Sequence, residues 1–127
     1  MLTETRAPGK LILLGEYAVL EGAPALVCAV DRYAKAGIGK RDDGRFSIES
    51  PTLGIGETKF SVSEQGIVRF FEAGEGVQRQ LGFFKVIFEF VFHYFKTCEI
   101  ETFPVALRLD TGAFYSAETR TKLGFGS

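Results

Sequence analysis

Apolar residues near the start of the chain follow the patterns of two β-strands. Residues 3–14 read as an extended segment that is broken at Pro8-Gly9. The run ALVCAV at residues 25–30 is apolar without interruption, which is typical of a strand that is covered on both faces. Between them, GEYAVLEGAP is bounded by glycines and a proline, and we expect a tight connection there.

Further strands are expected in the middle and towards the end of the chain. Strands at residues 33–40 and 46–50 flank the turn-like RDDG, which predicts a hairpin. Residues 50–66 carry prolines and glycines among short apolar residues, and they read as a loop followed by a short strand. PVALRLD, at residues 104–110, alternates apolar and polar positions and so predicts a half-buried strand.

The clearest helix is expected at residues 78–96. Polar residues and one glycine recur every three or four positions and therefore share one side of a helix, namely Gln78, Gly82, Lys85, Glu89, His93 and Lys96. Apolar residues occupy the rest of the circumference. Such a helix must pack against a sheet and against something else. Together the elements predict an α+β fold, a mixed sheet with packed helices.

Composition limits the classes of function. The 127 residues are 46% hydrophobic and 24% charged, in the range of one soluble globular domain or part of one. Lysine and arginine number 15 against 16 aspartates and glutamates, so no strong field would attract nucleic acid or an anionic membrane.

Two further features suit a cytoplasmic protein. The N-terminus lacks the pattern of a signal peptide, and the most apolar window, residues 81–95, carries Lys85, Glu89 and His93 and is too short to cross a bilayer. Cys28 and Cys98 are far apart and do not form a Cys-x-x-Cys pair, so we expect reduced thiols and no disulfide or metal site.

Candidate chemistry lies near the two ends of the chain. The sequence Gly124-Phe125-Gly126-Ser127 has the character of a phosphate-binding loop, although such a short motif is more often a simple turn. Lys10 precedes an apolar strand, where its ammonium could meet a phosphate or could simply be a solvated edge lysine.

Two more residues are candidates for a functional role. Glu16 lies in the break between the apolar runs, where it could bind magnesium, orient Lys10 or cap the short turn that follows, and capping is the default interpretation. His93 is the only histidine and lies on the polar stripe of the helix, so we expect an exposed side chain and no metal site.

Taken together, RAPGKLILLGEYAVLEGAPALVCAVDRYA at residues 6–34 resembles the first motif of the GHMP kinases, the family of galactokinase, homoserine kinase, mevalonate kinase and phosphomevalonate kinase. KLGFGS, at residues 122–127, is similar to the start of the family's second, glycine-rich motif. Lys10 favours the mevalonate and phosphomevalonate branches over galactokinases. The lysine before the glycine loop, and GEYA in the first motif, lean further towards phosphomevalonate kinase, whereas EGAPALV is equally like mevalonate kinases.

The resemblance implies an ATP-dependent, magnesium-using transfer of the γ-phosphate to mevalonate or phosphomevalonate. It implies that Lys10 contacts the transferring or acceptor phosphate and that Glu16 lies near the nucleotide. Lys122, Gly124, Gly126 and Ser127 would begin the cradle of the ATP phosphates.

The sequence departs from the family pattern by ending at Ser127, inside the second motif. The expectation is therefore a partial N-terminal domain over residues 1–127, without the C-terminal domain and inactive alone. The apolar helix would then promote a homodimer or a higher oligomer. The alternative is a non-catalytic binding or assembly module that retains part of the kinase fold.

Overall fold

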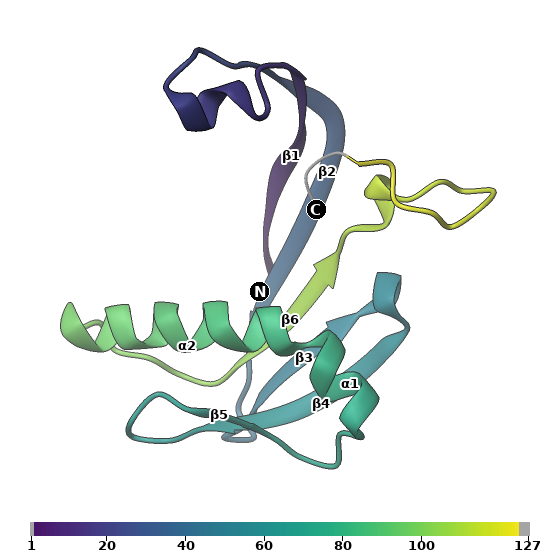
Figure 1. The fold of residues 1–127 in the computed structure, drawn as a ribbon. Coiled ribbons are helices and arrows are strands. Elements are labelled where there is room, and N and C mark those ends of the chain that lie inside the picture. The colour runs from purple at the N-terminus through teal and green to yellow at the C-terminus, as the bar shows by residue number, and fades with distance from the viewer. Residues whose placement is uncertain (1, 125–127) are drawn as a thin grey trace. The chain divides into compact units, whose positions relative to one another are not determined.

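The computed structural model describes residues 2–124, which form a six-stranded sheet with two α-helices (Figure 1). The strands are β1 (Leu2–Leu14), β2 (Leu26–Lys40), β3 (Phe46–Ser50), β4 (Ile55–Val62), β5 (Val68–Phe70) and β6 (Val105–Asp110). The helices are α1 (Glu75–Gln80) and α2 (Gly82–Thr97), with short 3-10 turns η1 (Ala18–Glu21), η2 (Pro51–Leu53) and η3 (Gly112–Phe114). None of the described helices is long and apolar enough to span a membrane.

The sheet is mixed, as the sequence predicts. Its strands pair in the order β1-β2-β6-β3-β4-β5. Strand β3 runs parallel to β6 and antiparallel to β4, and β4 runs antiparallel to β5. The expected α+β class is therefore confirmed.

The chain divides into two units. The first, which we call the helix unit, comprises Met1–Glu4 and Gly37–Leu109, and the second, the loop unit, comprises Thr5–Ala36 and Asp110–Ser127. Strands β1 and β2 contribute residues to both units.

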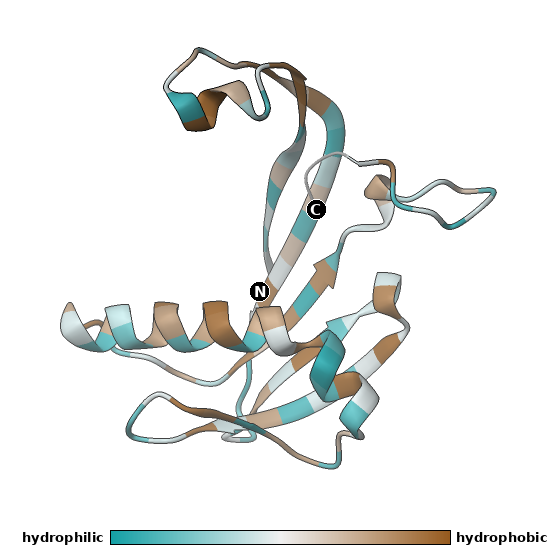
Figure 2. Cartoon of the chain, viewed as in Figure 1, coloured by the Kyte–Doolittle hydropathy of each residue, from teal (hydrophilic) through white to brown (hydrophobic). Residues whose placement is uncertain are grey.

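The core of the helix unit is where α2 packs on the sheet. Its buried residues are Ile48, Ile55, Phe60, Val68 and Leu81. The Phe60 ring lies 5.7 Å from that of Phe84 and 5.1 Å from that of Phe88, both edge-on, which is the arrangement that aromatic rings favour. Successive turns of α2 thus present phenylalanines to the sheet, and the hydropathy colouring shows the apolar bands of this helix (Figure 2).

Two local predictions were wrong because pairing in the sheet overrides local signals. Strand β1 continues through Pro8-Gly9, since β1 is the edge strand of the sheet and an edge strand tolerates the missing N–H of proline. The expected strands at 25–30 and 33–40 are one strand, β2.

The predicted hairpin between residues 33–40 and 46–50 does not form. Strand β6 lies between β2 and β3 in the sheet, and the Arg41 N–H donates a 2.9 Å hydrogen bond to the carbonyl of Pro104, which precedes β6. The turn after β2 therefore connects two strands that are not neighbours.

The expected helix is two helices, because Leu81 leaves the helical region (φ −85°, ψ 3°) between α1 and α2. At the other end of α2, the Ile100 N–H donates to the carbonyl of Phe95 (2.9 Å) and the Glu99 N–H to that of Lys96 (3.1 Å). These two bonds define a Schellman cap in which Glu99 occupies the left-handed position, with φ 55°.

We expect Glu99→Gly to stabilise the helix unit by about 1 kcal/mol, because glycine adopts this left-handed conformation without the steric cost that a Cβ adds. Thermal unfolding followed by circular dichroism measures the change. Glu101→Gly is the matched control, since Glu101 does not have a positive φ and should gain nothing. Equal effects of the two variants would contradict the capping account.

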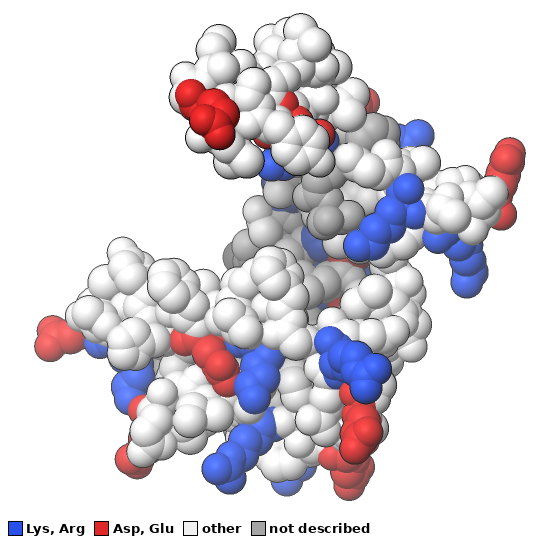
Figure 3. Space-filling view, in the orientation of Figure 1, with Lys and Arg blue, Asp and Glu red and all other residues white. Residues whose placement is uncertain are grey.

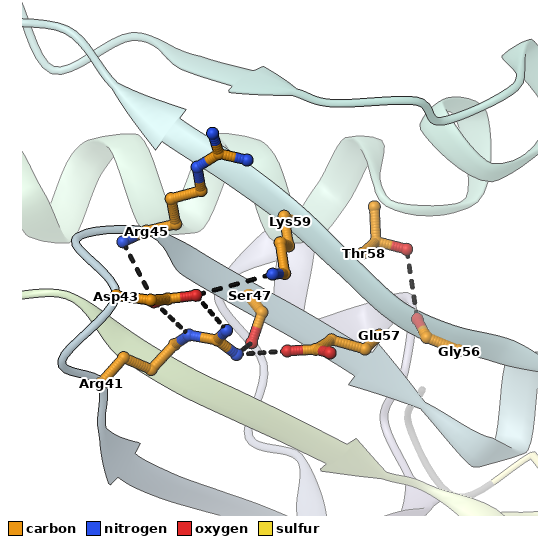
Figure 4. Close-up of polar contacts among 8 residues, drawn as sticks. All are labelled: Arg41, Asp43, Arg45, Ser47, Gly56, Glu57, Thr58 and Lys59. Carbon is orange, nitrogen blue, oxygen red and sulfur yellow. Dashed lines mark hydrogen bonds and ion pairs between the residues drawn. The ribbon is translucent and has the colours of Figure 1, made fainter.

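A network of polar contacts is centred on Arg41, which follows β2 (Figure 4). Its guanidinium donates to both carboxylate oxygens of Asp43, at 2.9 and 2.6 Å, and to the hydroxyl of Ser47 at 2.8 Å. It also donates to Glu57, and Lys59 lies 3.5 Å from Asp43. The hydrogen bonds from Arg41 hold the pKa values of Asp43 and Glu57 below their usual range, and the two carboxylates raise the pKa of Arg41.

These shifts predict a loss of stability in acid. Because the folded-state pKa values of Asp43 and Glu57 are depressed, the unfolded chain takes up protons first as the pH falls, so the contribution is present above about pH 4.5 and is lost below it. We expect the difference in melting temperature between the wild type and Arg41→Gln to shrink between about pH 5 and about pH 2. Arg69→Gln is the control, because Arg69 forms no ion pair among the described residues. A difference that stays constant with pH would refute the assignment.

Candidate functional site

Both candidate motifs lie in the loop unit. Residues 6–34 fall in its first segment, Thr5–Ala36, and Lys122 and Gly124 fall in its second segment, Asp110–Ser127. The whole helix unit except its first few residues lies between the two segments in sequence. The fold therefore gathers the first motif and the described residues of the second, 122–124, into one compact unit.

The turn after β1 depends on Gly15. This residue has φ +85°, and a Cβ added to it would lie 2.6 Å from the carbonyl oxygen of Pro24 and 2.9 Å from the Cα of Ala25. Both contacts are closer than real Cβ atoms make. Only glycine allows the two ends of this connection to approach so closely.

Backbone hydrogen bonds close the connection between β1 and β2. The Val19 N–H donates to the carbonyl of Gly15 at 3.0 Å, and the Ala23 N–H donates to that of Ala18 at 3.1 Å. Gly22 ends η1 in the left-handed conformation, with φ 81°. The connection is thus a folded turn with its own hydrogen bonds.

The polar candidates of the first motif are exposed. Lys10 projects from β1, and Glu16 follows Gly15. Neither side chain forms an ion pair or a hydrogen bond within residues 2–124. The residue that caps η1 is Tyr17, which makes no side-chain capping bond, so the interpretation of Glu16 as a helix cap was wrong.

The second motif is approached through a hairpin-like segment after β6. The Gly112 N–H donates to the Asp110 carboxylate at 2.8 Å, and the Leu123 N–H donates to the carbonyl of the buried Phe114 at 2.8 Å. Tyr115 pairs with Lys122 in an antiparallel bridge. The segment is therefore fixed up to the point where the glycine-rich motif begins.

The described part of the glycine-rich motif is open. Lys122 is exposed, and Gly124 has φ +75° with no atom within 4 Å of the position that a Cβ would occupy. A left-handed glycine with free space around it suits a loop whose N–H groups approach a ligand. The predicted cradle residues Gly126 and Ser127 lie outside the described residues.

One contact of this unit has no signal in the sequence. The Arg6 guanidinium lies 4.9 Å from the centre of the Tyr33 ring, which joins β1 to β2 by a cation–π interaction. Neither residue belongs to a recognisable pair in the sequence, because 26 residues separate them. The contact stabilises the strand that carries Lys10.

The described residues carry charged side chains of both signs. Positive and negative side chains are interspersed on the face seen in Figure 3. Within residues 2–124, no group of three or more His, Cys, Asp or Glu side chains could hold a metal ion, and His93 is exposed. The described residues thus offer ammonium groups and free backbone for phosphate, but no set of magnesium ligands.

Comparison with solved structures identifies the fold. Across 99% of its length the chain is similar to Lin0012 from Listeria innocua, with a TM-score of 0.78 and 24% identity. Across 98% it is similar to Streptococcus pneumoniae phosphomevalonate kinase in complex with phosphomevalonate and AMPPNP, with a TM-score of 0.67 and 17% identity. Methanococcus jannaschii mevalonate kinase matches 87% of the chain, with a TM-score of 0.62 and 20% identity.

The chain has the partial N-terminal fold of GHMP kinases. It spans 32% of the length of each of these three neighbours. No protein-family model matches the sequence, and the search of curated proteins gave no significant match. The likeness therefore establishes the fold, and the expectation drawn from the two motifs is confirmed at that level.

Proposed function

We propose that this chain is the N-terminal part of an ATP-dependent kinase that phosphorylates mevalonate or phosphomevalonate, a cytoplasmic step of isoprenoid precursor synthesis. The 127 residues correspond to 32% of the neighbours' length. We therefore propose that a longer polypeptide catalyses the phosphoryl transfer and that this chain alone does not. The bound ATP supplies the phosphoryl group.

The observation that carries the proposal is the gathering of both motifs in the loop unit. The Lys10 ammonium would offset negative charge on the transferring or acceptor phosphate. Lys122 would attract the ATP phosphates electrostatically, and the backbone at Gly124, with Gly126 and Ser127, would donate N–H groups to them. Glu16 would contribute a polar group near the nucleotide. The described residues do not form a magnesium site, so we route no step through that ion.

Two features of the loop unit support this assignment. The ammonium of Lys10 is exposed and is not neutralised by any carboxylate of residues 2–124, so it is available to an anion. Gly15 forms the tight turn that follows β1, so the backbone that carries Lys10 and Glu16 is held in one conformation. One of the similar structures was solved with phosphomevalonate and AMPPNP, which makes these two ligands the natural probes.

Removing the ammonium of Lys10 should weaken nucleotide binding. We expect Lys10→Ala to lower the affinity for ATP by about tenfold or more, which corresponds to about 1.4 kcal/mol, as is typical of a charge-assisted contact. Titration calorimetry with ATP measures the change. Lys35→Ala is the matched control, because Lys35 is also an exposed lysine of the loop unit and should leave the affinity unchanged. Equal losses in the two variants would refute the role of Lys10.

Two assays separate this proposal from its alternative, a non-catalytic binding or assembly module. Phosphorylation of mevalonate or phosphomevalonate is followed with ATP labelled at the γ-phosphate. Measurable turnover by the 127-residue chain would overturn the claim that it is inactive alone. If ATP does not bind at all, even at millimolar concentration, the assembly module becomes the better account, since the exposed apolar surface of α2 provides a docking face.

A further inference from the structure

The segment that leads from β6 to the glycine-rich motif has one buried side chain. Within residues 111–124 only Phe114 is buried, with 6% of its surface exposed, whereas residues 117–124 are all exposed. A side chain that is buried here stays buried when further polypeptide is attached, which is not true of an exposed one. Phe114 is therefore the point at which this segment is anchored to the rest of the chain.

Local hydrogen bonds fix the backbone around the anchor. The Phe114 N–H donates to the carbonyl of Thr111 at 2.9 Å, and the Tyr115 N–H donates to that of Gly112 at 3.1 Å. The Gly112 N–H donates in turn to the Asp110 carboxylate at 2.8 Å. These bonds hold η3 as one turn, so the direction of the Phe114 carbonyl is set together with the position of its ring.

The start of the glycine-rich motif is held by that carbonyl. It accepts the Leu123 N–H at 2.8 Å, and Tyr115 pairs with Lys122 in an antiparallel bridge. The side chains of Lys122 and Leu123 are exposed, so backbone pairing holds these two residues in place, and Gly124 follows them directly. The position of the motif thus depends on where Phe114 lies.

The tip of the hairpin-like segment is closed by its own hydrogen bonds. The Ser116 N–H donates to the carbonyl of Thr121 at 2.9 Å, and the Arg120 N–H donates to the carbonyl of Ser116 at 3.0 Å. The Ser116 hydroxyl accepts the N–H groups of Glu118 and Thr119, both at 3.3 Å. The tip therefore keeps its shape without burying a side chain, and burial holds the segment only at its base.

We propose that Phe114 is a positioning residue for ATP. Its burial holds the carbonyl that binds Leu123 and so orders the backbone of residues 122–124 before the nucleotide arrives. A loop that is ordered in advance loses less conformational entropy on binding, which raises the affinity. Phe114 acts through the loop and not by contact with the ligand. This inference rests on the function proposed above, in which the glycine-rich motif receives the ATP phosphates.

Titration calorimetry of the 127-residue chain with ATP is the first test. Phe114→Ala should weaken binding about tenfold or more, because the ligand must then order the loop itself. Phe114→Leu restores most of the buried volume and should bind nearly as the wild type does. Leu81→Ala is the matched control: it removes another buried apolar side chain, in the helix unit, and should lower stability without changing the affinity. Circular dichroism verifies that each variant is folded.

Amide hydrogen exchange without ATP gives a readout that a general loss of stability does not reproduce. The Leu123 amide should exchange at least about tenfold faster in Phe114→Ala than in the wild type, while the amides of α2 keep their rates. Leu81→Ala should show the reverse pattern, with faster exchange in α2 and an unchanged rate at Leu123.

Three results would overturn the proposal in distinguishable ways. Equal ATP affinity of Phe114→Ala and the wild type would refute the positioning role and leave the proposed function standing. A loss of affinity with unchanged exchange at Leu123 would show that Phe114 does not act by ordering the loop. If the wild-type chain itself does not bind ATP, the proposed function fails and the role of Phe114 fails with it.

Discussion

Gly15→Ala is expected to destabilise the chain by about 3 kcal/mol and to abolish nucleotide binding at the loop unit. The methyl group would sit 2.6 Å from the carbonyl oxygen of Pro24 and 2.9 Å from the Cα of Ala25, and both atoms belong to the backbone and cannot simply rotate away. The left-handed φ of +85° adds a conformational cost of about 1–2 kcal/mol. The turn would have to open, and Lys10 and Glu16 would lose their common scaffold. Urea unfolding and ATP titration measure the two effects.

Gly22→Ala separates the two causes. Gly22 has nearly the same φ, +81°, but no atom lies within 4 Å of the position of an added Cβ. We expect it to cost only about 1–2 kcal/mol, the conformational part alone, and to retain ATP binding. If the two alanine variants were equally stable, the close approach at Gly15 would not be what holds the turn.

The second large effect concerns the core of the helix unit. Phe60 is fully buried, and its ring packs against those of Phe46, Phe70, Phe84 and Phe88. Phe60→Ala removes the centre of this cluster and leaves a cavity, so we expect a loss of about 3–5 kcal/mol in the free energy of unfolding. For a domain of this size that is a large share of the total stability. Chemical denaturation measures it.

Phe83→Ala is the control that distinguishes inner from outer phenylalanines. The Phe83 side chain is 78% exposed, so its removal at low protein concentration should cost less than about 1 kcal/mol. A cost at low concentration similar to that of Phe60→Ala would mean that α2 lies the other way round on the sheet.

Local periodicity predicted most of the elements, and sheet pairing explains the failures. The alternation at residues 104–110 predicted β6 correctly because it reflects one buried face. The helical spacing at residues 78–96 predicted helical structure there, but not the break at Leu81 that separates α1 from α2. The break expected at Pro8 did not occur because β1 is an edge strand, where a proline is tolerated. The order of strands in the sheet cannot be read from the local sequence. In the same way, RDDG has the chemistry of a turn, but local sequence does not reveal that β6 lies between the strands it joins.

The candidate site was predictable in part. The two motifs could be found by resemblance, and the structure places their described residues in one unit. The close approach of Gly15 to Pro24 could not be predicted, because it depends on how the ends of the turn meet in space. The Arg41 network was likewise hidden in part, since Asp43 is a close neighbour in the sequence but Glu57 lies 16 residues away on β4.

The central claim, that the loop unit binds the phosphates of ATP, is tested most directly by residue-resolved NMR. ¹⁵N-labelled chain is titrated with ATP to about 10 mM, with sodium sulfate at equal ionic strength as the control for general anion binding. We predict that ATP shifts the resonances of Lys10, Glu16 and residues 122–124 far more than sulfate does, and that Lys10→Ala removes these shifts. Shifts that are absent, that sulfate reproduces, or that fall on the helix unit would contradict the account.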